Sequence, residues 1–143
     1  MIRKVQQRAQ QTISGFKSPA DDYLEGRLDI SDVLVIDPHC TFYFRMDGDT
    51  MSGFQIPHGS LLVVDRSLRA IDGAIVIACW QGKLLCRSLN FSPCGAASLQ
   101  SSNGIDPIAK DANLEVWGVV IAVCYNVMPK GLLKGKYRNV CAL

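Results

Sequence analysis

The stretch AIVIACWQGKLLCRSLNF, residues 74–91, decides the fold class. Two apolar runs flank the dipeptide Gln81-Gly82, which favours a tight turn between paired strands. The stretch therefore predicts a β-hairpin with strands at residues 74–80 and 83–91. Each run is far shorter than the ~20 apolar residues that a membrane-spanning helix needs.

Further strands are expected on both sides of this hairpin. The patterns CTFYFRM, SLLVVD, AASLQSS and LEVWGVVIAVCYNV predict strands at residues 40–46, 60–65, 96–102 and 114–127. Many short strands separated by Gly and Pro predict a mostly β domain with a closed or strongly curved sheet.

Three other segments carry weaker patterns. Ser18 and Pro19 are a typical cap and first residue of a helix, so a short helix is expected near residues 19–26. Residues 29–36 are expected to form a turn or a short strand, and residues 101–113 a loop.

The composition indicates one folded domain with basic ends. The chain has 143 residues, of which 48% are hydrophobic and 20% charged, and its formal net charge is +2. This charge is too small to predict nucleic-acid binding across the whole surface. We expect a flexible N-terminal arm at residues 1–17, a domain at residues 18–128 and a basic C-terminal tail at residues 129–143. Residues 1–20 and residues 129–143 contain Lys and Arg but no acidic residue. Either end could contact an acidic partner or nucleic acid, or simply be solvated.

The cysteines and histidines bear on metal binding and on the cellular compartment. The six cysteines form no C-x-x-C pair and there are only two histidines, so neither a metal site nor a cofactor is expected. Several cysteines lie inside apolar runs, where a free thiol behaves as a small hydrophobic group. No signal peptide or membrane span is recognisable, and a reducing, cytoplasmic localisation is therefore expected.

The acidic turn RMDGDTMSGF, residues 45–54, raises the question of catalysis. Its central Thr50 could be a nucleophile or a turn residue in a scaffold. His39 and His58 both lie in loops beside prolines, which disfavours a histidine-based triad. A hydroxyl–lysine dyad would need a lysine kept neutral by burial. The mid-strand basic residue is Arg87, however, and Lys83 lies roughly 13 Å further along the same strand at ~3.3 Å per residue.

Five segments together resemble the UmuD branch of the LexA-like self-cleaving peptidases, the S24 type: SGFKSPADDYLEGRLDI, FRMDGDTM, HGSLLVVDRS, DGAIVIACWQGKLLCRSL and LEVWGVVIAV. The resemblance covers about residues 15–127 in unbroken order. It implies a curved, partly closed β-sheet domain preceded by a flexible arm. In that family, RecA filaments on single-stranded DNA stimulate self-cleavage, and the trimmed chain serves the error-prone polymerase UmuC (DNA polymerase V).

Three features depart from the family pattern. Thr50 stands where the family has its nucleophilic serine, and Arg87 where it has its general-base lysine. The family's Ala-Gly or Cys-Gly cleavage site corresponds to Ser14-Gly15. Threonine keeps a hydroxyl but adds a methyl group that restricts χ1, whereas arginine cannot accept a proton at neutral pH. We therefore expect the dyad to be inactive or nearly so.

A buried Arg87 would need a partner for its charge. The candidate partners of Arg87 are Asp47, Asp49 and a backbone carbonyl. The structure of the turn and of the strand is expected to persist even if catalysis is lost.

The resemblance leaves three functional hypotheses. The first is an accessory subunit of a translesion polymerase that acts in mutagenesis during the SOS response to DNA damage. This subunit would cleave itself poorly. The second is an active self-peptidase that uses Thr50 and cuts at Ser14-Gly15. The third, a LexA-type repressor fragment, is disfavoured because a helix-turn-helix domain would have to precede the β domain. The partners implied are a second copy or a UmuD-type chain as homodimer or heterodimer, a UmuC-like polymerase and the RecA filament.

Overall fold

The computed structural model describes residues 29–129, and the chain divides into two compact units between Pro38 and His39. The expected arm, the expected helix near residues 19–26, nearly all of the basic tail and the Ser14-Gly15 bond lie outside the described residues. The expected domain boundary after residue 17 therefore stays a prediction.

The described part of the first unit contains the short helix α3 (Ile30–Leu34). Asp29 caps it: its side chain accepts hydrogen bonds from the backbone N–H of Ser31 at 2.9 Å and from the Ser31 hydroxyl at 2.6 Å. These two bonds, the hydroxyl bond foremost, lower the pKa of Asp29. The expectation of a turn or short strand at residues 29–36 was wrong for residues 30–34, which form this helix. The Asp29 cap stabilises the helix because it binds one of the first N–H groups, which have no partner within the helix.

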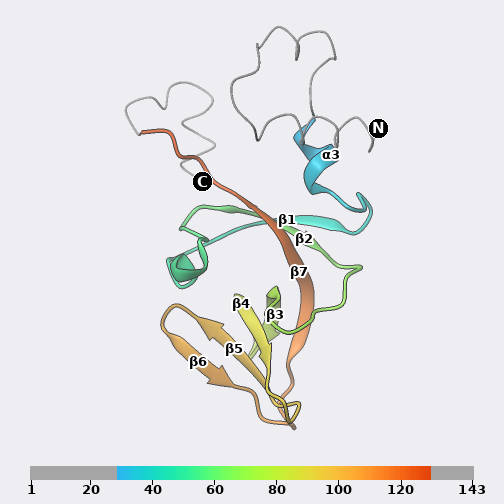
Figure 1. The fold of residues 1–143 in the computed structure, drawn as a ribbon, viewed down its shortest axis with the longest axis vertical. Coiled ribbons are helices and arrows are strands. Elements are labelled where there is room, and N and C mark those ends of the chain that lie inside the picture. The colour runs from blue at the N-terminus through green and yellow to red at the C-terminus, as the bar shows by residue number, and fades with distance from the viewer. Residues whose placement is uncertain (1–28, 130–143) are drawn as a thin grey trace, which may run out of the picture. The chain divides into compact units, whose positions relative to one another are not determined.

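The second unit is built on one antiparallel seven-stranded sheet in the order β1-β2-β7-β3-β4-β5-β6 (Figure 1). The prediction of a mostly β domain is confirmed. The sheet is open, because its edge strands β1 and β6 are not paired with each other. Its strands are β1 (Thr41–Arg45), β2 (Leu61–Asp65), β3 (Ile75–Trp80), β4 (Lys83–Phe91), β5 (Ala97–Ser101), β6 (Gly104–Pro107) and β7 (Glu115–Cys124).

The hairpin predicted from residues 74–91 is confirmed. Trp80 pairs with Lys83 across a two-residue turn. Gln81 and Gly82 have φ values of 52° and 73°, as required at both central positions of a type I′ turn. Glycine adopts such values without a steric penalty.

The expected loop at residues 101–113 was wrong in its first part, because β6 (Gly104–Pro107) pairs with β5. Glycine, aspartate and proline are all poor strand formers. An exposed edge strand tolerates them, since an edge residue such as Pro107 need not donate a hydrogen bond to a further strand.

The central strand β7 carries two irregularities that bend it. The register shifts opposite Val63/Val64 of β2 and again opposite Ile77/Ala78 of β3, which leaves Ile121 and Trp117 of β7 as extra residues. Such bulges increase local twist and curvature. The bend presents Trp117 to Phe42 and Phe44, whose rings meet it edge-on at centroid distances of 5.1 and 5.0 Å.

Both faces of β3 are buried, which explains its continuous apolar sequence. Ile77 belongs to one core cluster, together with Met51, Leu62 and Cys86, whereas its neighbours Val76 and Ala78 belong to a second cluster with Leu89 and Leu99. Because successive side chains of a strand point to opposite faces, the two clusters lie on opposite sides of β3. Buried Cys86 behaves as the small hydrophobic residue expected.

No helix within residues 29–129 is long and apolar enough to cross a membrane.

We predict that Gly118→Ala destabilises the fold. A Cβ at Gly118 would lie 2.6 Å from Val64 Cγ1, so the completely buried side chain of Val64 or the two strands would have to shift. Overpacking of this kind typically costs about 1–3 kcal/mol. Chemical denaturation should detect the loss, with the exposed Glu115→Ala on the same strand as the matched control, expected within about 0.5 kcal/mol of the parent. Equal stability of the two variants would contradict the tight β2–β7 approach.

Candidate functional site

Thr50 is held in a compact turn between β1 and β2. The N–H of Ser52 donates to Asp49 O at 3.0 Å, and the short 3-10 helix η1 (Ser52–Phe54) follows. Met51 is completely buried in the first core cluster. The turn is therefore anchored by an apolar side chain directly beside Thr50, which itself is half-buried.

A second anchor comes from the β5–β6 turn, about fifty residues further along the chain. The N–H of Ser102 donates to the Thr50 carbonyl at 2.7 Å, and the Ser102 hydroxyl accepts from the N–H of Gly53 at 2.8 Å. One residue thus fixes both ends of the segment that carries the Thr50 hydroxyl. The sequence interpretation missed Ser102, because these contacts depend on β6, which carries no strand pattern.

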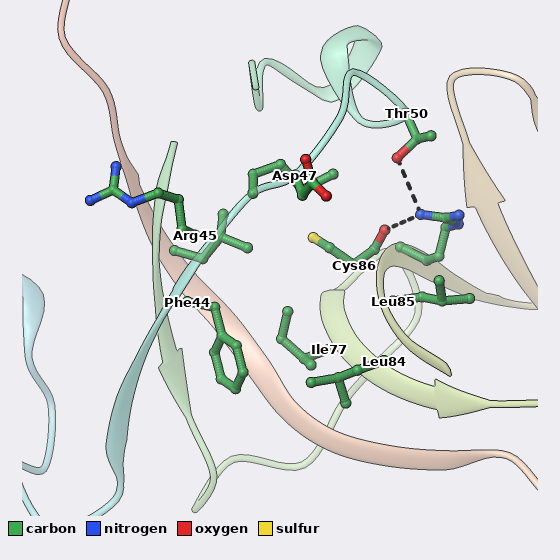
Figure 2. A pocket seen from close by; sticks show the side chains of 11 residues that line it. Phe44, Arg45, Asp47, Thr50, Ile77, Leu84, Leu85 and Cys86 are labelled. Atoms are coloured by element: carbon green, nitrogen blue, oxygen red, sulfur yellow. Dashed lines mark hydrogen bonds between the residues drawn. The ribbon is translucent and has the colours of Figure 1, made fainter. Parts of the chain in front are cut away.

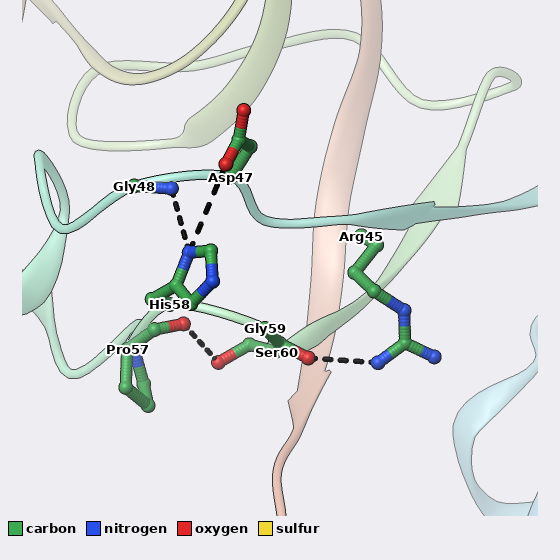
Figure 3. A network of polar contacts seen from close by, with 7 residues as sticks. All are labelled: Arg45, Asp47, Gly48, Pro57, His58, Gly59 and Ser60. Carbon is green, nitrogen blue, oxygen red and sulfur yellow. Dashed lines mark hydrogen bonds and ion pairs between the residues drawn. The ribbon is translucent and has the colours of Figure 1, made fainter. Parts of the chain in front are cut away.

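A polar network braces the other side of the loop (Figure 3). The Nδ1 atom of His58 accepts a hydrogen bond from the N–H of Gly48 at 2.8 Å and lies 3.8 Å from Asp47 Oδ1. Arg45 donates to the Gly59 carbonyl at 2.9 Å. His58 is exposed, as expected, and its contacts support the loop.

Arg87 on β4 reaches the Thr50 hydroxyl. Its Nη1 donates to Thr50 Oγ1 at 3.3 Å and to the backbone carbonyl of Cys86 at 2.7 Å, the two dashed lines of Figure 2. The carbonyl is the one of its three expected partners that is observed. Among the described residues, no carboxylate lies within 4.0 Å of the guanidinium, so neither Asp47 nor Asp49 neutralises it.

This arrangement constrains the chemistry of the hydroxyl. A guanidinium is a donor only, so Thr50 Oγ1 must accept in its contact with Arg87. A nucleophile needs a neighbour that takes its proton. The contact with Arg87 polarises the oxygen but offers no place for that proton.

The two side chains open onto a cleft of about 290 Å³. Its charged lining residues are Arg45, Asp47 and Arg87, and Lys83 is not among them. The remaining lining is Thr50 and mainly apolar side chains: Phe44, Met46, Leu62, Ile77, Leu84, Leu85 and Cys86. A mostly apolar cleft with a few polar groups is typical of ligand-binding sites.

Cys86 is not an alternative nucleophile. Burial raises the pKa of its thiol to about 11, and the nearby charge of Arg87 offsets this only in part. The thiol is therefore protonated at neutral pH, whereas the reactive form of cysteine is the thiolate.

Metal chemistry has no visible site in the described part of the chain. No group of three or more His, Cys, Asp or Glu side chains among residues 29–129 is arranged to hold a metal ion.

The thiols of Cys94 and Cys86 should differ strongly in reactivity. Cys94 is exposed, and hydrogen bonds from the Ser92 side chain and then the Ala96 backbone lower its pKa. We predict that iodoacetamide at pH 7.5 alkylates Cys94 at least about tenfold faster than Cys86, since thiolate fraction and access both favour it. Peptide mass mapping over time measures both rates in one sample. Faster labelling of Cys86 would contradict the buried, protonated thiol.

Comparison with known proteins places this site in a family. The model of the Peptidase S24-like family matches residues 8–121, a range that includes Gly15, Thr50 and Arg87. Protein MucA of Salmonella typhimurium is 34% identical over 115 residues, covering 78% of this chain and 77% of the relative. Protein SamA of Salmonella typhimurium is 35% identical over 109 residues, covering 76% of each chain. Protein ImpA of Shigella flexneri is 34% identical over 112 residues, covering 78% and 77%. The chain therefore belongs to the Peptidase S24-like family, as a UmuD-like member.

Proposed function

We propose that the chain is a UmuD-like accessory subunit of an error-prone translesion DNA polymerase of the polymerase V type, acting in SOS mutagenesis and unable to cleave itself efficiently. Family membership supports the accessory role. The hydrogen bond from Arg87 to Thr50 at 3.3 Å carries the second half of the proposal.

The loss of activity follows from the chemistry of the two side chains. Positioned proton transfer typically contributes ~10²–10⁴-fold to a rate, and groups that act as a unit lose most of their effect when one fails. Arg87 remains protonated, so this contribution is absent. The β-methyl of Thr50 adds a steric obstacle on the path of attack.

An uncleaved subunit would work by binding. We propose that it forms homodimers or pairs with a UmuD-type chain, and that it loads onto a UmuC-like polymerase in the cytoplasm. A chain that keeps its arm would hold the assembly in the untrimmed state when RecA filaments form, unless a partner subunit removes the arm.

The retained hydroxyl favours one alternative. Thr50 lines the cleft, so slow RecA-stimulated cleavage at Ser14-Gly15 with Thr50 as nucleophile needs only a base other than Arg87, such as a water molecule.

Restoring the family residues should restore cleavage. We predict that Thr50→Ser combined with Arg87→Lys yields a product lacking residues 1–14 when incubated with RecA, single-stranded DNA and an ATP analogue. The parent chain should give at least about 100-fold less, since it lacks the base. Intact-mass spectrometry identifies the product. Thr50→Ser combined with Arg87→Gln is the matched control, because it supplies the nucleophile without a base. Efficient cleavage of the parent would establish the alternative.

The arm should decide activity in mutagenesis. In a strain without its own UmuD, and with the UmuC-like polymerase from the same source as this chain, we predict that a chain beginning at Gly15 restores damage-induced mutagenesis. The full chain should restore at least about tenfold less, and mutation frequency after ultraviolet irradiation measures both. If neither chain restores mutagenesis, the accessory role is contradicted.

A further inference from the structure

Among residues 29–129, Arg87 has no counter-ion inside the cleft. The side chain is half-buried, and its two hydrogen bonds go to neutral oxygens, those of Cys86 and Thr50. No described carboxylate lies within 4.0 Å of it. A partly desolvated cation without a paired anion is costly, so an anion that entered the cleft would be bound favourably.

The guanidinium retains free donors for such an anion. Both hydrogen bonds use Nη1, whereas Nη2 and Nε make none to the described residues. Among the described residues, Asp65 Oδ2 is the one buried side-chain nitrogen or oxygen atom that has no hydrogen-bond partner. Nη2 and Nε of Arg87 are therefore not buried without a partner. Nη2 and Nε are the pair of donors that matches a carboxylate bidentately. The Thr50 hydroxyl accepts from Arg87, and its own proton remains available to a ligand oxygen.

The strand beside Arg87 has an open edge. β4 pairs with β3 from Lys83 to Ser88, but with β5 only from Ser88 onward. The N–H and carbonyl of Leu89 bond toward β3. By alternation along the strand, the backbone groups of Leu84 and Cys86 point the other way, where β5 does not reach. The Cys86 carbonyl that accepts from Arg87 marks this edge.

The apolar part of the cleft lies along the same edge. Leu84, Leu85 and Ile77 line it, and Leu84 is 51% exposed, which is high for a leucine. Figure 2 shows Leu84 and Ile77 at the end of the cleft away from Thr50. Asp47 would oppose an anion, but its side chain is fully exposed, so water and salt screen its charge.

We propose that this cleft binds the carboxylate of an extended peptide. The Arg87 fork and the Thr50 hydroxyl receive the carboxylate, the backbone of the peptide runs along the open edge at Leu84 and Cys86, and an apolar side chain next to the carboxylate occupies the volume lined by Leu84 and Ile77. A C-terminal carboxylate and an aspartate or glutamate side chain share this chemistry. The proposal goes beyond the accessory role and depends on the charge of Arg87, not on cleavage.

Binding of labelled peptides to the full-length chain tests the proposal. The first probe is tetramethylrhodamine-Gly-Ser-Thr-Val-Leu with a free C-terminal carboxyl, and the second is the same peptide as its C-terminal amide, which has no carboxylate. The third is the amide with Glu in place of Thr, so that its only carboxylate is on a side chain. Fluorescence anisotropy at low salt should show that at least one carboxylate peptide binds at least about tenfold tighter than the uncharged amide. The stronger of the two acidic probes identifies the source of the carboxylate.

Two charge-removing variants assign the site. Arg87→Gln should abolish the preference for the carboxylate, whereas Arg69→Gln, which removes an exposed cation that does not line the cleft, should leave it unchanged. The comparison of acid and amide on the parent chain requires no variant, so equal binding of the probes would overturn the proposal even if Arg87→Gln failed to fold. Equal binding of all three probes, or a preference that survives Arg87→Gln, would overturn the proposal.

Discussion

The hydrogen bond from Arg87 to the Thr50 hydroxyl connects two parts of the chain whose positions are fixed independently. The hairpin turn at Gln81-Gly82 sets the register of β3 and β4 and thereby the place of Arg87. The buried Met51 and the two backbone ties to Ser102 set the place of Thr50. Neither residue can move away without disturbing a core cluster or a strand pairing. The geometry of a dyad is thus retained by packing, while the chemistry at its centre depends on which side chain the strand supplies.

Under the proposed function, this separation explains how a peptidase fold is kept without peptidase chemistry. The core packing on both faces of β3 and the bulged strand β7 do not involve the guanidinium. A substitution at residue 87 is therefore expected to change the site more than the fold. The exchange of a lysine-like base for a fixed cation converts a group that transfers protons into one that binds anions. The same contact between Arg87 and Thr50 underlies both proposals, the loss of self-cleavage and the binding of a carboxylate.

Much of the fold could be predicted from the sequence, because β2, β3 and β7 are mainly apolar runs and Gln81-Gly82 marks the turn of the hairpin. The strand at residues 83–91 was predicted with its observed bounds. β6 was missed because an exposed edge strand bears no hydrophobic pattern, and α3 because a single capped turn has too few residues for a helical period. Thr50 and Arg87 were found through their positions in a family pattern. Ser102 could not be found in this way, because its contacts depend on the turn between β5 and β6. A backbone carbonyl was expected as a partner of Arg87, but the sequence could not tell that it is the one of Cys86.

The pH dependence of self-cleavage is the most direct test of whether Thr50 lacks a base that can take its proton. A lysine base becomes more active as it loses its proton, whereas an arginine stays protonated across the accessible range. The purified chain is incubated without RecA between pH 7 and 9, and loss of residues 1–14 is followed by intact mass. The range ends at pH 9 because the folded protein loses stability above that pH. Burial raises the pKa of Cys86 from its usual value of 9.0 to about 11, so between these two values the thiol ionises in the unfolded chain but not in the fold. The account predicts no cleaved product at any of these pH values. A product whose rate rises with pH would contradict it, because a titrating base would then be acting on Thr50.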